Sequence, residues 1–499
     1  MNKPIRLLSI GCMLLFLALL GQATYVQYWQ AEDLSTLAKH PDNVRVRDAQ
    51  FSRERGPIVV RRGNKSIAIA ESNKIDSRYL YQRTYPQARL YAHLTGFFTR
   101  DYGLGGVEAS QNSLLSGSDS KLFLNRVIDM LDNQQPQGAS VELTINPAAQ
   151  QAAYDGLHKL GENIRGSVVA LEPASGRILA MVSSPTYDPN QLATHDFGGV
   201  GKSKTQLETQ KPSPLNNTAI ESPLPPGSTF KLVTAAAALA DGYNPTSKVP
   251  GGRFLDLPQT TRVLPNEGGA SCGGDKITLT QALMVSCNVA FGDIAMKVGA
   301  KKLGEQAKKF GFGEKYFTDL DDPLTTQARS RFPENPDAPQ TAMSGIGQFD
   351  VAATPLQMAM VAAGIANRGT VMKPYLVEQA KSPDLDVLWK KDPEPLPDQP
   401  AMSSRNAADL TQMMVSVVDG GTGTGAQIPG MQVAGKTGTA QSAADRPPYA
   451  WFVSFAPDRD AKVAVAVLIE DAGVERNSIS GNGLAAPIAK AVMEAVARP

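Results

Sequence analysis

Cysteine and histidine are scarce in this sequence, with three cysteines and four histidines among 499 residues. The histidines are scattered and lack the short spacing of metal ligands, so the sequence predicts no metal site. Cys12 lies in an apolar N-terminal run, which leaves Cys272 and Cys287 as the only cysteines in the rest of the chain. Neither belongs to a Cys-x-x-Cys pattern, and this disfavours zinc-binding and thioredoxin-like functions.

Net charge is also nearly absent. The chain has 49 Lys and Arg residues against 48 Asp and Glu residues, which gives a formal net charge of +1. A nucleic-acid-binding protein normally concentrates positive charge on one face, so we expect no nucleic-acid partner. The sequence contains no internal repeat, and its length exceeds one ordinary core, so we expect at least two domains.

The long apolar run lies at the N-terminus, directly after the basic residues Lys3 and Arg6. A basic start followed by an apolar centre is typical of a signal sequence. Apolar and aromatic residues continue to Trp29, a length that can span a bilayer. We favour a retained transmembrane signal-anchor at 7–29 with a cytoplasmic tail at 1–6 and an exported remainder. A cleaved signal sequence is the alternative.

Hydrophobic periodicity along the rest of the chain predicts an α+β architecture. Strands are expected at 57–60, 66–70, 167–171, 178–182, 433–434, 451–455 and 463–469. Helices are expected at 147–160, 228–240, 278–285, 289–298, 355–366, 405–418 and 484–496. Because strands lie near both ends of the second half with helices between them, we expect one sheet that unites distant segments. Residues 196–217 and 383–403 are polar or proline-rich and are expected to be surface loops.

Ser228 is the strongest candidate nucleophile. Prolines and a glycine at 225–227 end the preceding segment, and the alanine-rich stretch 231–240 favours helix, which places Ser228 at a helix N-terminus. Lys231 follows on the same face, where burial and the helix N-terminus lower the pKa of a lysine enough for it to take the serine proton. The pattern Ser-x-x-Lys also occurs at Ser118–Lys121, and on this motif alone a simple helix cap at Ser228 is the favoured interpretation.

A second short motif, Ser286-Cys-Asn288, falls at an expected bend between two helical segments. In a bent or extended backbone the Ser286 hydroxyl and the Asn288 amide project together and can face one cleft. Ser-x-Asn also occurs elsewhere, and Ser404 in one such copy is better explained as the cap of the helix that follows. The motif therefore gains meaning only from its position after Ser228.

A third motif, Lys-Thr-Gly-Thr at 436–439, follows an apolar strand and contains the single Lys-Thr-Gly of the chain. Lys436 supplies positive charge, and Gly438 allows close approach of a ligand to a strand edge. A strand that simply ends in a turn explains the segment equally well when it is taken alone.

Taken in this order, the three motifs resemble the signature of the penicillin-binding proteins and serine β-lactamases. Further segments resemble the monofunctional class B penicillin-binding transpeptidases, and the likeness extends over nearly the whole chain. These segments are 55–58, 93–96, 103–108, 172–181, 354–357 and 450–452. The length, a compact pedestal and Ser-Cys-Asn are most similar to the actinobacterial penicillin-binding protein A group, whereas Asn216–Thr218 and Val60 depart from the usual pattern.

The resemblance implies a transpeptidase domain at 147–499, with an antiparallel sheet flanked by helices, after a pedestal domain at 30–146. It implies that Ser228 attacks a peptidoglycan stem peptide ending in D-Ala-D-Ala, and that an amine of a second stem peptide then takes the acyl group. No cofactor is needed for this chemistry. β-Lactam antibiotics would be covalent inhibitors, and other cell-wall synthesis or division proteins would be partners at the membrane.

The resemblance also implies a role for each motif residue. Lys231 would be the general base, and Ser286 would relay a proton to the leaving nitrogen with the help of Lys436. The substrate-binding residues would be Asn288, Lys436, Thr437, Gly438 and Thr439, with the carboxylate on the two threonines. Backbone N–H groups of Ser228 and Thr439 would form the oxyanion hole.

Three alternatives share part of this pattern. A serine β-lactamase needs a further base for deacylation, and no Glu-x-x-Leu-Asn lies between Asn288 and Lys436. A D,D-carboxypeptidase would use water as the acceptor, and the motifs alone do not distinguish it. A non-catalytic scaffold that recruits wall-synthesis proteins is a hypothesis of another class, which the intact motif residues disfavour.

Cys272 and Cys287 are expected to form a disulfide. They are the only cysteines of the part expected outside the cytosol, where disulfides persist. The short loop between them makes such a bond worth about 3 kcal/mol in the chain-entropy model. The alternative is a small buried thiol at Cys287 and an unrelated loop residue at Cys272.

Overall fold

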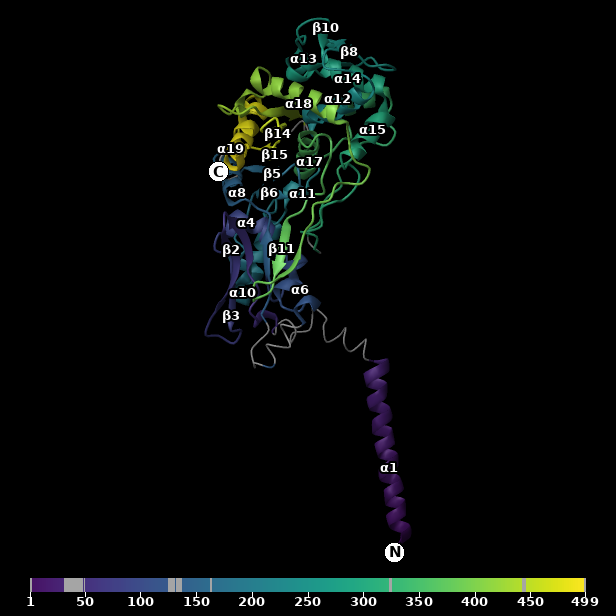
Figure 1. Ribbon diagram of the computed structural model, residues 1–499, viewed down its shortest axis with the longest axis vertical. Helices are drawn as coiled ribbons and strands as arrows, with labels where there is room; N and C mark the ends of the chain where they lie inside the picture. Colours follow the sequence, from purple (N-terminus) through teal and green to yellow (C-terminus); the bar gives the residue numbers. More distant parts are fainter. Residues whose placement is uncertain are drawn as a thin grey trace.

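The computed structural model describes residues 2–30, 48, 50–123, 131, 137–161, 164–322, 325–441 and 446–497. Figure 1 shows a narrow middle part and a larger mixed part that holds the C-terminus, besides the N-terminal helix. The middle part, built on a six-stranded sheet, is called the pedestal below. The larger part, built on a five-stranded sheet, is called the upper part.

The N-terminal helix α1 (Asn2–Thr24) continues into a short π-helix, η1 (Tyr25–Trp29). Among the described residues, the span Lys3–Trp29 is one helix long and apolar enough to cross a membrane, with a mean hydropathy of 2.0. Its most apolar window is not buried against protein. The rings of Tyr28 and Trp29 lie 5.0 Å apart at its end, and aromatic side chains favour the membrane–water interface.

The pedestal sheet has the strand order β12-β11-β4-β1-β2-β3. Its strands are β1 (Ile58–Arg62), β2 (Lys65–Lys74), β3 (Tyr81–Thr84), β4 (Ser140–Leu143), β11 (Val377–Lys381) and β12 (Val387–Lys390). β1 and β4 run parallel, and the other neighbours run antiparallel. Arg62 pairs with Lys65 across the expected turn, so the predicted β1–β2 hairpin is confirmed.

Two pedestal strands come from far along the chain. Ala380 of β11 lies opposite Val141 of β4, and β12 pairs with β11 at the edge of the sheet. The prediction of a surface loop at 383–403 is therefore wrong for 387–390. Leu388 and Trp389 of this short strand pack against the core, but four residues in a proline-rich segment are too few to show a period.

Short helices complete the pedestal and its junction with the upper part. They are α4 (Ala88–Thr95), α5 (Gly106–Ser110), α6 (Asn112–Leu115), η2 (Ser120–Leu122), α9 (Asn190–Ala193) and α10 (Phe197–Thr209). The prediction of a loop at 196–217 is wrong for the residues of α10. The Asp196 side chain caps this helix by accepting from Gly199 N, and Val200 and Leu207 are buried on one face against Phe97.

A buried ion cluster joins three segments of the pedestal. Arg55 Nε and Arg83 Nε donate to the two oxygens of Glu108 at 2.9 and 2.7 Å, and the Tyr85 hydroxyl donates at 3.2 Å. The side chains of these three charged residues are at most 1% exposed. Burial alone would raise the pKa of Glu108, but the two guanidinium groups hold it below its ordinary value.

The five-stranded antiparallel sheet has the order β13-β14-β15-β5-β6. Its strands are β5 (Arg165–Leu171), β6 (Ile178–Ser184), β13 (Ala434–Ala440), β14 (Tyr449–Ala456) and β15 (Val463–Asp471). Val467 of β15 lies opposite Val168 of β5, so the predicted sheet of distant segments is confirmed. The predicted β5–β6 hairpin is also present, with Val169 opposite Met181.

Helices cover both faces of this sheet, which explains its nearly continuous apolar strands. Side chains on one face, such as Val168 and Val465, pack with α8 (Pro147–His158) and α19 (Ala486–Ala497). Their neighbours on the other face, such as Val169, pack with α17 (Pro355–Ala366) and the helices beyond it. Figure 1 shows α8 and α19 together on one side of the sheet and α17 on the other.

Most of the remaining helices form a lobe on the α17 side. They are α11 (Thr218–Glu221), η3 (Gly227–Phe230), α12 (Lys231–Ala240), η4 (Glu267–Gly269), α13 (Leu279–Met284), α14 (Asn288–Val298), α15 (Ala300–Lys309), α16 (Ala338–Gly345) and α18 (Ser404–Asp419). Three short helical turns follow α18 and β15, namely η5 (Thr424–Ala426), η6 (Arg476–Ser478) and η7 (Gly481–Ala485), and η5 and η7 pack against α19. Two small strand pairs lie between α12 and α13: β7 (Lys248–Pro250) with β10 (Lys276–Thr278), and β8 (Phe254–Asp256) with β9 (Val263–Pro265).

The predicted helices at 355–366 and 405–418 are confirmed as α17 and α18. The cap of α18 is Ser403, whose side chain accepts from Asn406 N. The assignment of Ser404 as the cap is therefore wrong by one residue. The physical reason is that Ser404 already has helical geometry as the first residue of α18, while Ser403 keeps the extended backbone that a cap requires.

Candidate active site

Ser228 lies in η3, a 3-10 turn that leads directly into α12. Its expected place at a helix N-terminus is therefore confirmed. The Ser228 side chain caps neither η3 nor α12, and the Pro226 carbonyl accepts from Thr229 Oγ1 at 2.7 Å instead. Ser228 is half-buried. The simple cap role is thus rejected, and the hydroxyl remains available for chemistry.

The turn that carries Ser228 is fixed on two sides. Gly227 has a φ of +52°, and its N–H donates to Gly347 O at 3.0 Å. A Cβ on Gly347 would lie 2.1 Å from Gly227 O, so only glycine permits this contact. The indole N–H of the buried Trp451 donates to Pro225 O at 3.0 Å. These contacts hold the Ser228 turn next to β13.

Gly438 of β13 has a role different from the one expected. A Cβ there would lie 3.0 Å from both Pro226 O and Thr229 Cγ2. The space beside Gly438 is thus filled by the Ser228 turn itself, not by a ligand. The absence of a Cβ at Gly438 thus allows the third motif to pack against the turn of the first motif.

Two buried lysines meet at the second motif. Lys231 Nζ donates to Ser286 O at 2.6 Å and to Asn288 Oδ1 at 2.7 Å, and it lies 3.3 Å from Ser286 Oγ. Lys436 Nζ donates to the same Ser286 Oγ at 2.8 Å and to Thr437 O at 2.8 Å. Both lysines are fully buried. The structure thus brings all three motifs together around the Ser286 hydroxyl.

Ser228 and Lys231 share one helical segment, but no hydrogen bond joins them in the described part of the chain. Lys231 instead holds the Ser286–Asn288 turn, a contact that the spacing within Ser-x-x-Lys does not reveal. Its distance of 3.3 Å from Ser286 Oγ creates a short path for a proton between the first and second motifs. The helical register predicts that the Ser228 hydroxyl faces this path.

Burial controls the charge of both amines. It lowers the pKa of Lys231 well below its ordinary value, and the positive charge of Lys436 lowers it further, while the carboxylate of Glu267 opposes the shift. Burial also lowers the pKa of Lys436 to about 7. Burial thus favours the neutral form of each amine, and a neutral amine can accept a proton, as a general base must.

The hydroxyl of Thr437 lies beside one that the sequence analysis missed. Thr437 Oγ1 and Thr422 Oγ1 are 2.7 Å apart and share a hydrogen bond. Thr422 N donates to Met284 O at 3.2 Å, which ties this loop to the end of α13. The glycine-rich stretch 420–425 around Thr422 is a signal that could have marked it. Thr439 lies half-buried farther along β13.

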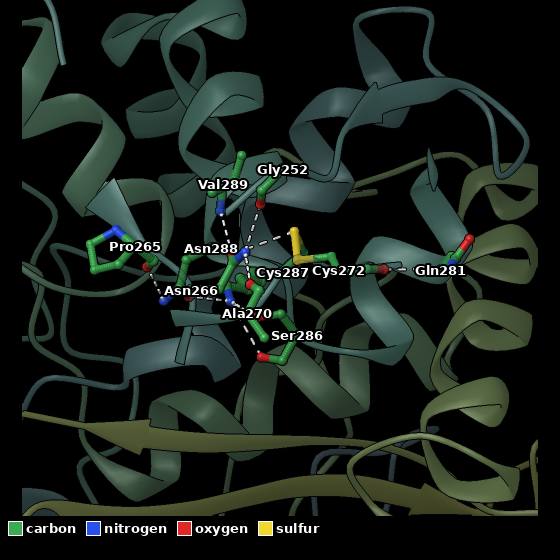
Figure 2. The surroundings of a disulfide bond; sticks show 11 residues. Gly252, Pro265, Asn266, Ala270, Cys272, Gln281, Ser286, Cys287, Asn288 and Val289 are labelled. Carbon is green, nitrogen blue, oxygen red and sulfur yellow. Dashed lines mark hydrogen bonds between the residues drawn. A yellow bond between two sulfur atoms is a disulfide. The ribbon is translucent and has the colours of Figure 1, made fainter. Parts of the chain in front are cut away.

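The Ser286–Asn288 turn is held by a segment that carries no recognised motif. Asn288 Nδ2 donates to Pro265 O at 3.1 Å, and Val289 N donates to Asn266 Oδ1 at 3.1 Å. Figure 2 shows these residues around the turn, with Asn266 at the centre of the contacts. Sequence reasoning also missed Asn266 and its neighbour Glu267, because neither stands in a pattern that predicts function.

The structure joins Cys272 and Cys287 in a disulfide, with their Cα atoms 5.8 Å apart (Figure 2). The pairing expected from cysteine count and compartment is thus present. Cys287 is the middle residue of Ser-x-Asn, so the bond ties that turn to the preceding segment. Both cysteines are buried, whereas Cys12 is free and exposed.

The second Ser-x-x-Lys pattern lies in the pedestal, away from these residues. Ser118 shares a hydrogen bond with Ser116, Oγ to Oγ at 2.9 Å, and Lys121 lies over the Trp389 ring at 5.7 Å. Both residues are exposed. No other motif residue meets them in the described ranges, whereas Lys231 contacts both Ser286 and Asn288 of the second motif.

Comparisons with known proteins give the same assignment. Residues 166–494 match the penicillin binding protein transpeptidase domain, and residues 55–141 match the penicillin binding protein A dimerisation domain. The chain is 42% identical to peptidoglycan D,D-transpeptidase PbpA of Mycolicibacterium smegmatis, over 100% of this chain and 99% of that one. It is 41% identical to PbpA of Mycobacterium tuberculosis, over 99% of each chain.

Solved structures extend this likeness. The ceftriaxone acyl-enzyme complex of M. tuberculosis penicillin-binding protein A matches with a TM-score of 0.84 and 40% identity, covering 90% of this chain and 99% of that one. The penicillin G acyl-enzyme complex of the same protein matches with a TM-score of 0.82 and 41% identity, covering 89% and 99%. The chain therefore belongs to the penicillin-binding protein transpeptidase family, in the class B group that includes PbpA.

Proposed function

We infer that this chain is a peptidoglycan D,D-transpeptidase that works through an acyl-enzyme on Ser228. The observation that carries the inference is the meeting of both buried lysines at Ser286 Oγ, since one of them, Lys231, directly follows the turn that carries Ser228. The names of the relatives and the β-lactam acyl-enzymes of similar structure support the same reaction.

In the first half-reaction, Ser228 Oγ attacks the penultimate carbonyl carbon of a stem peptide that ends in D-Ala-D-Ala. Lys231, kept neutral by burial, takes the serine proton. Backbone N–H groups of Ser228 and Thr439 stabilise the oxyanion. The C–N bond then breaks, and the proton passes through Ser286, which contacts both lysines, to the nitrogen of the departing D-alanine.

In the second half-reaction, an amine of another stem peptide attacks the acyl carbon and releases Ser228. The amine proton returns along the same path through Ser286 and Lys231. Lys436 supplies positive charge near the donor's terminal carboxylate during the first step. The residues assigned to substrate binding are Asn288, Lys436, Thr437, Gly438 and Thr439, with Gly438 acting through its backbone. A β-lactam would acylate Ser228 and stall there.

The domain plan follows the two sheets. We assign the pedestal to 30–146 and the transpeptidase domain to 147–499, although β11 and β12 of the latter return to the pedestal sheet. Residues 1–6 are assigned as a cytoplasmic tail and 7–29 as the membrane anchor, because Lys3 and Arg6 favour the cytoplasmic side. The rest of the chain then lies outside the membrane, among wall-synthesis or division proteins. Both domain ranges include residues outside the described set.

Labelling with a fluorescent penicillin, followed by timing of label loss, tests this function. Slow loss is expected for a transpeptidase, because the chain lacks the Glu-x-x-Leu-Asn base with which a β-lactamase activates water for deacylation. Rapid loss would indicate a β-lactamase, and absence of label would indicate a scaffold. Incubation with donor and acceptor stem peptides should then give a cross-linked dimer by mass spectrometry, whereas a carboxypeptidase would give only the trimmed donor.

A further inference from the structure

The backbone at Ser286 adopts a conformation that serine rarely occupies. Its φ is +59°, in the left-handed region that favours glycine. Such a residue stays in place only where its surroundings determine its position. Lys231 provides part of that hold by donating to Ser286 O at 2.6 Å. Leu283 O at the end of α13 accepts from Ser286 N at 3.1 Å. The segment 251–272 holds the three residues that follow, Cys287 to Val289, and lies beside them in space (Figure 2).

Asn266 is the centre of that segment, and its side chain is buried with 8% exposure. Its Nδ2 donates to Gly252 O and to Ala270 O, both at 2.8 Å, which fixes the segment to itself. Its Oδ1 accepts from Val289 N at 3.1 Å, in the first turn of α14. These contacts use both amide donors and the amide oxygen, so no other side chain of similar size reproduces the set.

The hydrogen bond from Val289 N to Asn266 Oδ1 caps α14 in place of its own N-cap residue. The residue at the cap position is Cys287, whose side chain makes no cap hydrogen bond because its sulfur is bound to Cys272. Asn266 provides the acceptor from a different part of the chain. Next to it, Pro265 O accepts from Asn288 Nδ2 at 3.1 Å, which leaves Asn288 Oδ1 directed to Lys231 at 2.7 Å.

We propose that Asn266 is a positioning residue for the transpeptidase reaction, which holds Ser286 and Asn288 where both active-site lysines can reach them. The proposal rests on the function inferred above. Without the Asn266 side chain, the start of α14 loses its cap and the 251–272 segment loses its internal ties. The Ser286 hydroxyl then moves relative to Lys231 and Lys436, and the proton path lengthens.

The test is the second-order rate of acylation by a fluorescent penicillin, measured on the full chain in detergent. Asn266→Ala should lower this rate roughly 10- to 100-fold, the size of effect that a misplacement near 1 Å produces. The matched control is Asn146→Ala. Asn146 caps α8 by accepting from Ala148 N and Ala149 N, and α8 lies on the far side of the sheet. This control should lower the melting temperature without slowing acylation.

A double-mutant cycle with Ser286→Ala separates positioning from general destabilisation. If Asn266 acts through the Ser286 hydroxyl, Asn266→Ala should not lower the acylation rate further in the Ser286→Ala background. Should the alanine variant not fold, Asn266→Asp keeps the acceptor for Val289 N but loses both donors, and the same cycle applies. The proposal would be overturned if folded Asn266→Ala or Asn266→Asp acylated at the wild-type rate. It would also be overturned if the rate losses of the Asn266 and Ser286 substitutions added fully in the double variant. Absence of label on the wild-type chain would instead overturn the proposed function itself.

Discussion

At the residue scale, the chemistry depends on two amines that water does not reach. Burial lowers the pKa of both Lys231 and Lys436, and each amine contacts the Ser286 hydroxyl. Their mutual repulsion disfavours the doubly protonated pair. In the proposed mechanism, Lys231 is therefore the base and Lys436 the cation.

Lys231→Arg should abolish acylation, with a loss of at least about 100-fold, the usual contribution of a general base. Arginine keeps the charge but cannot give up its proton, since its pKa stays above about 12. The measurement is the rate of covalent penicillin labelling. Lys302→Arg on the exposed surface of α15 is the matched control and should label normally. Near-normal labelling of Lys231→Arg would mean that Lys231 acts only through its charge.

The rate of acylation should depend on pH in two directions. As the pH falls, Lys231 gains a proton and the base is lost. As the pH rises through about 7, Lys436 loses the charge that attracts the substrate carboxylate. Lys436→Arg should keep that charge and remove the alkaline decrease below about pH 10, while the acidic decrease remains. The second-order rate constant reports these groups in the free enzyme. An alkaline decrease unchanged in Lys436→Arg would exclude Lys436 as its source.

Three short patterns in order along the chain, together with the family resemblance, singled out the residues whose chemistry is distinctive. Ser228, Lys231 and Lys436 were predicted because nucleophile, base and cation occur at recognisable spacings. Asn266 and Thr422 could not be predicted in this way, because an amide or hydroxyl that only makes hydrogen bonds leaves no pattern along the chain. Their partners, such as Val289 for Asn266, are known only once the fold brings them together.

At the element scale, two short stretches control the geometry of the site. The Ser228 turn is fixed by its glycine contacts, and the Ser286 turn is fixed by Asn266 and the disulfide. Both turns lie between helices, where backbone groups would otherwise lack partners. The site therefore depends on tight connections as much as on the sheet beneath them.

Thiol counting tests the disulfide. The denatured, unreduced full chain, recovered from an oxidising compartment, should show a single reactive thiol from Cys12, and reduction should raise the count by two. In a Cys12→Ser variant the unreduced chain should show none. Three thiols in unreduced wild-type material would contradict the pairing. Reduction should slow penicillin acylation even at temperatures where the chain stays folded. The reason is that the bond holds the Ser286 turn, besides adding about 3 kcal/mol to the free energy of unfolding.

Glu108→Gln should destabilise the pedestal by about 3 kcal/mol, because it leaves Arg55 and Arg83 buried without a counter-charge. Denaturant unfolding measures this, and Glu305→Gln on the exposed face of α15 is the control, with an effect below about 0.5 kcal/mol. The folded-state pKa of Glu108 is lowered, so its stabilisation is present above the unfolded pKa of about 4.3 and is lost as the pH falls. Equal stability of both variants would contradict this account.

The elements predicted correctly are those with a strong period and clear ends. The β1–β2 and β5–β6 hairpins and the helices α17 and α18 are of this kind. α10 was missed because glycines and polar residues separate its few buried positions, Val200 and Leu207 among them. β12 was missed because it pairs with β11, which in turn joins a sheet whose other strands lie more than two hundred positions earlier in the chain.

At the scale of the whole molecule, the pedestal and the upper part are joined both by chain connections and by strand pairing. β11 leaves the upper part, pairs with β4 in the pedestal, and the chain then returns through β12 to α18. This excursion adds to the ties that the connection between β4 and α8 and the segment of α9 make between the pedestal and the upper part. The length of the chain predicted more than one domain, but only pairing in three dimensions reveals that the pedestal sheet contains strands from both parts of the chain.

The central claim, that Ser228 is the residue acylated, is tested most directly on the full chain by mass spectrometry. Wild-type protein treated with penicillin should gain one adduct, and peptide mapping should place it on Ser228. Ser228→Ala should gain none while keeping its melting temperature, because the Ser228 side chain caps no helix and makes no structural bond of its own in the described part of the chain. An adduct retained at full level in Ser228→Ala, mapping to Ser118 or any other residue, would contradict the account.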